Sequence, residues 1–275
     1  MNNLILANLM RLKKSKIFWG IAAFMAMLGF FFAFMKKQVR DSGMDATLES
    51  GAFQYVALVG IVIAVFCAIF TGTEYADGTL RNKIIAGHQR WEIYLSTFVV
   101  CSLTSMFFCL IHMVCYLGLG AVLLGGFGEA VWAMVIFAGC ALMLSVCFSA
   151  IFTLVVLLCH NKAASAVACI LLALLLLFAG SYIKGLLDEP EVYGGYYMDE
   201  TGTLQNAEPE PNPRYISGTT RDVYTFLLDA TPGGQQIQVS TMENDKPWLL
   251  AGYSSVISVA VTALGIALFR KKELK

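Results

Sequence analysis

The 275-residue sequence has few charged residues, and this shortage excludes an ordinary soluble protein. Only 14% of its residues are Asp, Glu, Lys or Arg, whereas 58% are hydrophobic. A typical soluble domain has a charged content of roughly 25%. The mean hydropathy is +0.69. The composition therefore predicts an integral membrane protein.

Sequence motifs for nucleotide binding and for zinc-dependent hydrolysis are also missing. The chain has no G-x-x-x-x-G-K-[ST] sequence, the Walker A loop that holds nucleotide phosphates, and no H-E-x-x-H sequence. Ionisable residues are nearly absent from the middles of the apolar runs, where secondary transporters normally carry their ion or proton sites. We therefore expect the energy for any transport to come from another chain.

Six apolar runs are long enough to cross a hydrocarbon core of about 30 Å, which takes about 20 helical residues. They predict an all-α polytopic membrane protein with a single transmembrane domain over residues 1–275. The first run is too long for a signal peptide and no small-residue cleavage site follows it, so we expect it to be retained. The predicted spans are Ile17–Met35, Gln54–Thr71, Ile93–Leu119, Val131–Leu158, Ala163–Leu187 and Trp248–Phe269.

The distribution of Lys and Arg predicts the orientation, since cytoplasmic flanks of membrane spans collect positive charge. With the N-terminus inside, 12 of the 19 basic residues lie on the cytoplasmic side. Six spans then place both termini in the cytoplasm. All eight cysteines lie within or at the ends of the spans, so no disulfide framework is expected in the outer loops.

The loop at residues 188–247, between spans five and six, is predicted to be external and is strongly acidic. It has 11 Asp and Glu residues against three basic residues. Its first half is rich in Pro, Gly and Tyr and is predicted to be irregular. In its second half, Thr220 is expected to cap an amphipathic helix that ends at residues 231–234 and lies on the membrane or at the bundle mouth. The predicted apolar stripe of this helix is Val223, Phe226 and Leu227. The loop either attracts or repels cationic peptides, or is a hydrated spacer.

Residues 1–16 predict an amphipathic helix on the cytoplasmic membrane surface. Its apolar face would hold Ile5, Leu6, Leu9 and Leu12, with Asn8, Arg11 and Lys14 largely on other faces. In this interpretation Lys and Arg reach anionic headgroups. The alternative is a simple positive anchor for the first span.

A polar insert at residues 73–92, between the second and third spans, is the most informative part of the chain. Gly78 and Gly87 bracket a predicted short helix, Thr79–Ala86, with Thr79 expected as the cap acceptor. An apolar face on such a helix suits docking into a groove of a partner protein, and an ordinary interfacial turn is the alternative. We expect Leu80, Ile84 and Ile85 to form that face, and Arg81, Asn82 and Lys83 to point elsewhere.

Glu74 and Asp77 lie where the second span leaves the membrane. Paired acids can be catalytic, but no His, Ser or Cys nucleophile lies near them in the sequence. We predict a structural role instead, in which Glu74 pairs with Arg81 or Arg90 and fixes the angle of the short helix.

His112 is the exceptional ionisable residue inside a span. With Cys109 and Cys115 it forms a C-x-x-H-x-x-C sequence, but these residues spread over nearly two helical turns, so a metal would need other helices. A proton relay and a hydrogen-bonded packing histidine are the other interpretations. An intramembrane enzyme would have to use His112 together with hydroxyls such as those of Ser102, Thr104 and Ser105.

One residue pattern runs through the insert into the next span. It reads Glu74-x-x-x-Gly78-Thr79-x-Arg81-Asn82, followed by Gly87-x-x-Arg90-x-x-Ile93-Tyr94-x-Ser96. This pattern resembles the first cytoplasmic loop of type-2 ABC exporter permeases, the family that includes the membrane subunits of bacitracin-resistance and lantibiotic-immunity transporters. Six spans, an amphipathic N-terminal helix and a long outer segment also resemble that family.

The resemblance implies a permease subunit in a bacterial plasma membrane that works as a homodimer or heterodimer. It implies no catalytic residue, metal or cofactor in this chain, with ATP and Mg bound by a separate ATPase, and an amphipathic cargo such as an antimicrobial peptide, a drug or a lipid-like molecule. A non-transporting sensor or scaffold is the competing class. The residues implied in ATPase coupling are Glu74, Gly78, Thr79, Leu80, Arg81, Asn82, Ile84, Ile85, Gly87 and Arg90.

Overall fold

The computed structural model describes residues 1–128, 131–159, 161–194, 196–198, 204–206 and 210–272. Six of its helices are long and apolar enough to cross a membrane. These six confirm the predicted spans: one has the predicted bounds, and the other five extend beyond them at one or both ends. They are α2 (Lys16–Asp41), α3 (Val56–Ala76), α5 (Arg90–Leu124), α6 (Val131–Leu158), α7 (Lys162–Leu187) and α10 (Pro247–Lys271).

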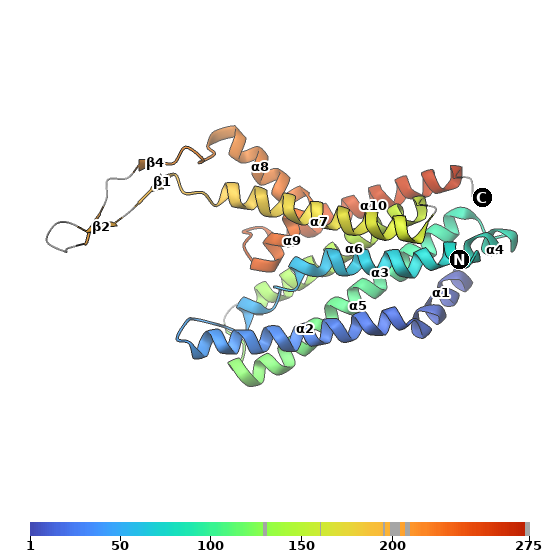
Figure 1. Cartoon of the computed structure of the whole chain (residues 1–275), viewed down its shortest axis with the longest axis horizontal. Helices are drawn as coiled ribbons and strands as arrows, with labels where there is room; N and C mark the ends of the chain where they lie inside the picture. The colour runs from blue at the N-terminus through green and yellow to red at the C-terminus, as the bar shows by residue number, and fades with distance from the viewer. Residues whose placement is uncertain (129–130, 160, 195, 199–203, 207–209, 273–275) are drawn as a thin grey trace.

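The long helices run side by side, and shorter elements gather at the two ends of the bundle (Figure 1). One end, here called the α4 end, holds the two termini, α1 (Asn2–Lys14) and α4 (Thr79–Ile85). The opposite end, the α8 end, holds α8 (Gly218–Ala230) and α9 (Pro232–Thr241). The short 3-10 helix η1 (Glu49–Gly51) precedes α3.

Helix α3 is the central element of the bundle. Of its most apolar stretch, 67% is buried, and the helix contacts α6, α7 and α9. The outer helices α2, α7 and α10 bury less than a third of their most apolar stretches. Their exposed surfaces carry large apolar side chains such as Phe24, Leu175 and Val259, as expected of helices that face lipid.

Helix α5 is longer than predicted at both ends. It begins with a capping box, in which Gln89 and Glu92 each accept a hydrogen bond from a backbone N–H of the first turn. It continues through Gly118 and Gly120 and ends at Leu124, and the next residue, Gly125, has a φ of +89° that favours glycine. Gly118 and Gly120 therefore lie inside α5 and not in the turn that follows it.

The sequence Thr231-Pro232-Gly233-Gly234 ends one helix and also begins another. Helix α8 stops there as predicted, but Thr231 then caps α9 by accepting a hydrogen bond from the backbone N–H of Gly234, at 3.3 Å. Proline at the first helical position fits this start. Helix α9 packs among α3, α6 and α7, and Gly180 of α7 lies so close to Gly233 that a Cβ would clash with its backbone.

Helix α8 begins earlier than predicted. It begins at Gly218 after Ser217, so Thr220 lies inside the helix and is not its cap. The predicted stripe of Val223, Phe226 and Leu227 is exposed, and Leu228 is the residue that packs against the bundle.

Four short strands lie in the segment that was predicted to be irregular. Strand β1 (Val192–Tyr193) pairs with β4 (Glu210–Pro211), and β2 (Tyr196–Met198) pairs with β3 (Leu204–Asn206), both antiparallel. The two ribbons project from the α8 end, away from the bundle (Figure 1).

Candidate functional site

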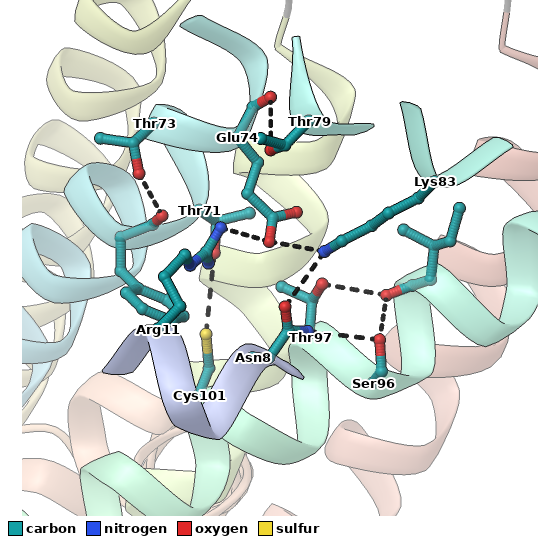
Figure 2. Close-up of polar contacts among 12 residues, drawn as sticks. Asn8, Arg11, Thr71, Thr73, Glu74, Thr79, Lys83, Ser96, Thr97 and Cys101 are labelled. Carbon is teal, nitrogen blue, oxygen red and sulfur yellow. Dashed lines mark hydrogen bonds and ion pairs between the residues drawn. The ribbon is translucent and has the colours of Figure 1, made fainter. Parts of the chain in front are cut away.

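Glu74 is the centre of a buried ion-pair network at the α4 end. Its side chain, in the last turn of α3, is 0% exposed and accepts from Arg11 Nη1 and from Lys83 Nζ, the latter at 2.7 Å (Figure 2). A buried carboxylate is costly unless such partners are present. The predicted pairing with Arg81 or Arg90 is therefore wrong, because one cation comes from α1 and the other from the inner face of α4.

Asn8 extends the network into α1 and α5. Lys83 Nζ donates to Asn8 Oδ1 at 3.0 Å, and Asn8 Nδ2 donates to Ser96 Oγ at 3.4 Å (Figure 2). Asn8 is only 2% exposed. Four helices, α1, α3, α4 and α5, thus meet in one polar cluster.

Helix α1 lies within residues 1–16, but the prediction for its Arg11 is wrong. Its polar residues Asn8 and Arg11 bind other parts of the protein, whereas Leu6 and Met10 are exposed. Arg11 also lies over the ring of Phe70, with its guanidinium carbon 4.0 Å from the ring centroid. The expected contact of Arg11 with headgroups is replaced by contact with α3.

Two glycines define the ends of α4. Gly78 and Gly87 have φ values of +65° and +88°, a left-handed conformation that favours glycine. Thr79 is not the cap acceptor that was predicted, because its hydroxyl donates to the backbone oxygen of Glu74 at 3.2 Å. A seven-residue helix is too short to be stable alone, so contacts with the bundle must hold α4.

The predicted apolar face of α4 is divided between the inside and the outside of the protein. Leu80 is 2% exposed and packs in a cluster with residues of α1, α5, α6 and α10, and Ile84 packs against the same cluster. Ile85, in contrast, is 74% exposed. Arg81 and Asn82 are exposed as well. The surface of α4 that is free for a partner therefore consists of Arg81, Asn82 and Ile85.

Arg90 binds the end of the last long helix and not Glu74. Its Nη1 donates to the backbone oxygens of Phe269 (3.4 Å), Arg270 (3.3 Å) and Lys272. A cation at a helix C-terminus satisfies carbonyls that have no partner within the helix and interacts favourably with the helix dipole. Arg90 therefore connects the start of α5 to the end of α10.

Lys272 makes a similar connection to α6. Its Nζ donates to the backbone oxygens of Leu157 (2.8 Å) and Cys159 (3.1 Å) and to the hydroxyl of Tyr75 (2.9 Å). Burial lowers the pKa of Lys272 to about 8. The helix ends around α4 are thus bound to one another through basic side chains.

The lowered pKa of Lys272 predicts an unusual dependence of stability on pH. Its ordinary pKa is 10.5, so above about pH 8 the unfolded chain binds more protons than the folded chain, and folding gains stability as the pH rises. We expect the melting temperature of the wild type to rise relative to that of Lys272→Met between about pH 7.5 and about pH 9.5. Thermal unfolding of both proteins in detergent measures this, and parallel pH curves would contradict it.

His112 packs among aromatic rings. Its ring centroid lies 4.1 Å from that of Tyr55, 5.9 Å from Phe32 and 6.2 Å from Tyr116. Neither ring nitrogen has a hydrogen-bond partner among the described residues. These contacts support the packing interpretation, without the hydrogen bond that it assumed.

The hydroxyls of the enzyme alternative do not assemble around His112. Ser105 Oγ lies 2.8 Å from Ser149 Oγ of α6, and Thr104 donates to the backbone oxygen of Val100 at 2.7 Å. Within the described part of the chain, no group of three His, Cys, Asp or Glu residues is arranged to hold a metal.

These features define a polytopic membrane protein in which a short protruding helix is fixed to the bundle by a buried polar network. The sequence model of the family described as "ABC-2 family transporter protein" matches residues 4–180, well over half of the chain. The chain therefore belongs to the ABC-2 transporter family, the type-2 ABC permeases, and is a multi-pass protein of the bacterial cell membrane.

The matched region contains the whole Glu74 network and α4, whereas α8, α9 and α10 lie outside it. A comparison with curated proteins found no match. The resemblance to bacitracin-resistance and lantibiotic-immunity transporters stays a prediction.

Proposed function

We propose that the chain is the permease subunit of an ATP-driven exporter and that α4 is its coupling helix, which docks on a separate ATPase subunit. The observation that supports this most directly is the division of α4 into two faces. Leu80 and Lys83 bind the bundle, while Ile85 is exposed, as are the polar residues Arg81 and Asn82. An exposed apolar side chain on a rigidly held helix suits insertion into a groove of a partner.

The α4 end is the cytoplasmic end in this proposal. It carries the basic segments around α1, α4 and the end of α10, and positive charge collects on cytoplasmic flanks. Both termini lie at this end (Figure 1). The α8 end, with its acidic segment, is then external.

The Glu74 network supplies a route for mechanical coupling. In this mechanism, ATP binding brings two ATPase subunits together and displaces α4. Displacement of Lys83 acts on Glu74 in α3 and on Asn8 in α1, and Asn8 in turn contacts Ser96 in α5. A push on α4 would thereby move three other helices, and the spans would rearrange to expel a substrate.

The active exporter is proposed to be a dimer of permease chains with a dimer of ATPase subunits, which hold ATP and Mg. An amphipathic cargo, such as an antimicrobial peptide, a drug or a lipid-like molecule, suits spans whose exposed surfaces are apolar. The proposed direction is out of the cell or the membrane.

Co-purification tests the proposal. The tagged chain is purified from native membranes in mild detergents, bound chains are identified by mass spectrometry, and ATP hydrolysis is assayed. We expect an ABC ATPase to accompany the permease and to hydrolyse ATP. If no ATPase accompanies it in any of several detergents, the exporter function is rejected, and the sensor or scaffold becomes the better interpretation.

A further inference from the structure

The α8 end contains a polar cavity of about 900 Å³, which lies between α7, α8, α9 and the segment before α10. Ligand pockets in proteins typically measure about 300–1,000 Å³. The cavity is lined by four carboxylates. They are Asp188, Asp229, Glu243 and Asp245.

Two of the carboxylates share one lysine. Lys184 Nζ lies 2.7 Å from Asp188 and 2.9 Å from Glu243. Two other cations line the cavity. Arg221 is partly exposed and donates to the backbone oxygens of Leu187 at 2.8 Å and Ile216 at 3.4 Å, and Lys246 is exposed. None of these three cations forms an ion pair with the remaining two acids, Asp229 and Asp245.

Asp229 accepts from a neutral group only. Asn244 Nδ2 donates to its Oδ1 at 3.2 Å, and no Lys or Arg lies within ion-pair distance of it in the described ranges. Asp245 is exposed and likewise has no cationic partner there. The four acids of the wall thus outnumber its three cations, and Asp229 and Asp245 form no ion pair among the described residues.

Gln238 of α9 adds an unpaired hydrogen-bond donor to the same wall. The orientation of Asn244 is fixed, because its Oδ1 accepts from the backbone N–H of Lys246 at 2.7 Å and its Nδ2 donates to both Asp229 and Gln238 Oε1. Gln238 must therefore accept through Oε1, which leaves Nε2 as a donor. Gln238 is 3% exposed, lines the cavity, and its Nε2 has no acceptor among the described residues.

A buried donor without an acceptor is costly, and so is a carboxylate without a cation in a partly desolvated wall. A ligand that brings both a cation and a carbonyl oxygen would satisfy Asp229 and Gln238 together, since both contact the same amide nitrogen of Asn244. We infer that this cavity is a binding site for a cationic peptide, which places a primary ammonium on Asp229 and a backbone carbonyl on Gln238 Nε2. The ammonium comes from a lysine side chain or from a peptide N-terminus.

This inference deepens the proposed function, and the external location of the cavity rests on it. A zwitterionic lipid headgroup fits less well, because the wall has four acids against three cations and so favours a ligand with a net positive charge over one with none. For an exporter, the site is where a cationic cargo is held on the outer side.

The test is a binding measurement on the full-length permease in phosphatidylcholine nanodiscs, by isothermal titration calorimetry. Acetyl-Lys-Gly-amide offers a side-chain ammonium, Gly-norleucine-amide an N-terminal ammonium, and acetyl-norleucine-Gly-amide no ammonium. We expect binding of at least one ammonium peptide and not of the neutral peptide. Equal binding of the neutral peptide, or no binding of any of the three, would overturn the inference.

Three variants locate the site. Asp229→Asn keeps the acceptor for Asn244 but removes the charge, and should weaken binding about ten-fold or more. Thr225→Lys, at an exposed position that lines the cavity, adds a competing ammonium and should weaken binding without disturbing the core. Asp222→Asn is the matched control on the same helix, because Asp222 is exposed and does not line the cavity.

The outcomes separate this inference from the proposed function. If an ATPase co-purifies but the three variants bind the peptides alike, the peptide site is rejected and the exporter stands. If the peptides bind as expected but no ATPase accompanies the chain, the site stands and the exporter does not. Loss of peptide binding when phosphatidylethanolamine replaces phosphatidylcholine would reject the peptide in favour of a lipid ammonium.

Discussion

Replacing Ile85 by Asp is expected to release the ATPase subunit while the six-helix bundle stays folded. Ile85 is the large apolar residue on the free face of α4, and it is 74% exposed, so its removal disturbs no internal contact. A central apolar anchor of an interface contributes about 2 kcal/mol or more, which corresponds to about a 30-fold loss of affinity. A charged replacement in a desolvated groove adds to this loss.

Co-purification and ATP hydrolysis of the complex measure the effect, with the melting temperature of the permease as the check on folding. Ile85→Leu is the matched control, because it keeps an apolar side chain of similar volume, and should retain the partner. An Ile85→Asp protein that carries the ATPase as well as the wild type does would show that α4 is not the docking element.

Replacing Leu80 by Asp, in contrast to replacing Ile85, is expected to destabilise the permease itself. Leu80 and Ile84 face the cluster that also contains Leu4, Tyr94 and Phe269, so a charge at Leu80 would be buried without a partner. We expect a lower melting temperature and poor expression, whether or not an ATPase exists. Loss of a partner in this variant would therefore reveal nothing about docking, although the sequence alone treats all three apolar residues of α4 as one face.

This difference shows what helical periodicity can predict. The spacing of Leu80, Ile84 and Ile85 gives their angular positions around the helix axis, but it does not say which side the bundle occupies. That information depends on where α1, α5 and α10 pack, and two of these helices, α1 and α10, lie far from α4 in the chain. The six spans, in contrast, depend on local hydrophobicity alone, and all six were predicted from the sequence.

Helix α9 was missed for a related reason. Its sequence, PGGQQIQVST, has two glycines and three glutamines, a composition typical of a loop. The glycines are required because a Cβ on Gly233 would clash with the backbone of α7 and one on Gly234 with the backbone of α8. Gln236 Nε2 donates to the backbone oxygen of Ala57 in α3 at 2.6 Å. The sequence did contain one signal of a new helix: Pro232 follows Thr231, as a proline at the first helical position follows an N-cap threonine.

The sequence predicts that Glu74 pairs with a basic residue, but not which one. A carboxylate at the end of an apolar span requires a cation, and the sequence offers several basic residues nearby. Arg11 is 63 positions away in the chain, and nothing in the sequence places α1 across the end of α3. The choice of Lys83 depends on the turn at Gly78, which directs that face of α4 back to the bundle.

Replacing Glu74 by Ala is expected to lower both the stability of the permease and its coupling to ATP hydrolysis, while membrane insertion stays intact. Without the carboxylate, Arg11 and Lys83 face each other as two like charges beside Phe70 and Asn8. Removing one partner of a buried ion pair typically costs about 3–5 kcal/mol. Insertion depends on the hydrophobicity of the spans, which this change does not affect.

A double-mutant cycle separates the interaction between Glu74 and Lys83 from a general loss of stability. Glu74→Gln keeps the shape of the side chain, and Lys83→Met keeps most of the aliphatic stem. If Glu74 and Lys83 act as a pair, the combined variant should lose clearly less than the sum of the single losses, both in melting temperature and in the ATP hydrolysis of the reconstituted complex. Additive losses in stability would mean that the two side chains contribute independently. A further outcome concerns Glu74→Ala permease that still binds as much ATPase as the wild type. If its ATP hydrolysis is unchanged, the movement of α4 reaches the spans through Leu80 and the apolar cluster, and not through the ion pair.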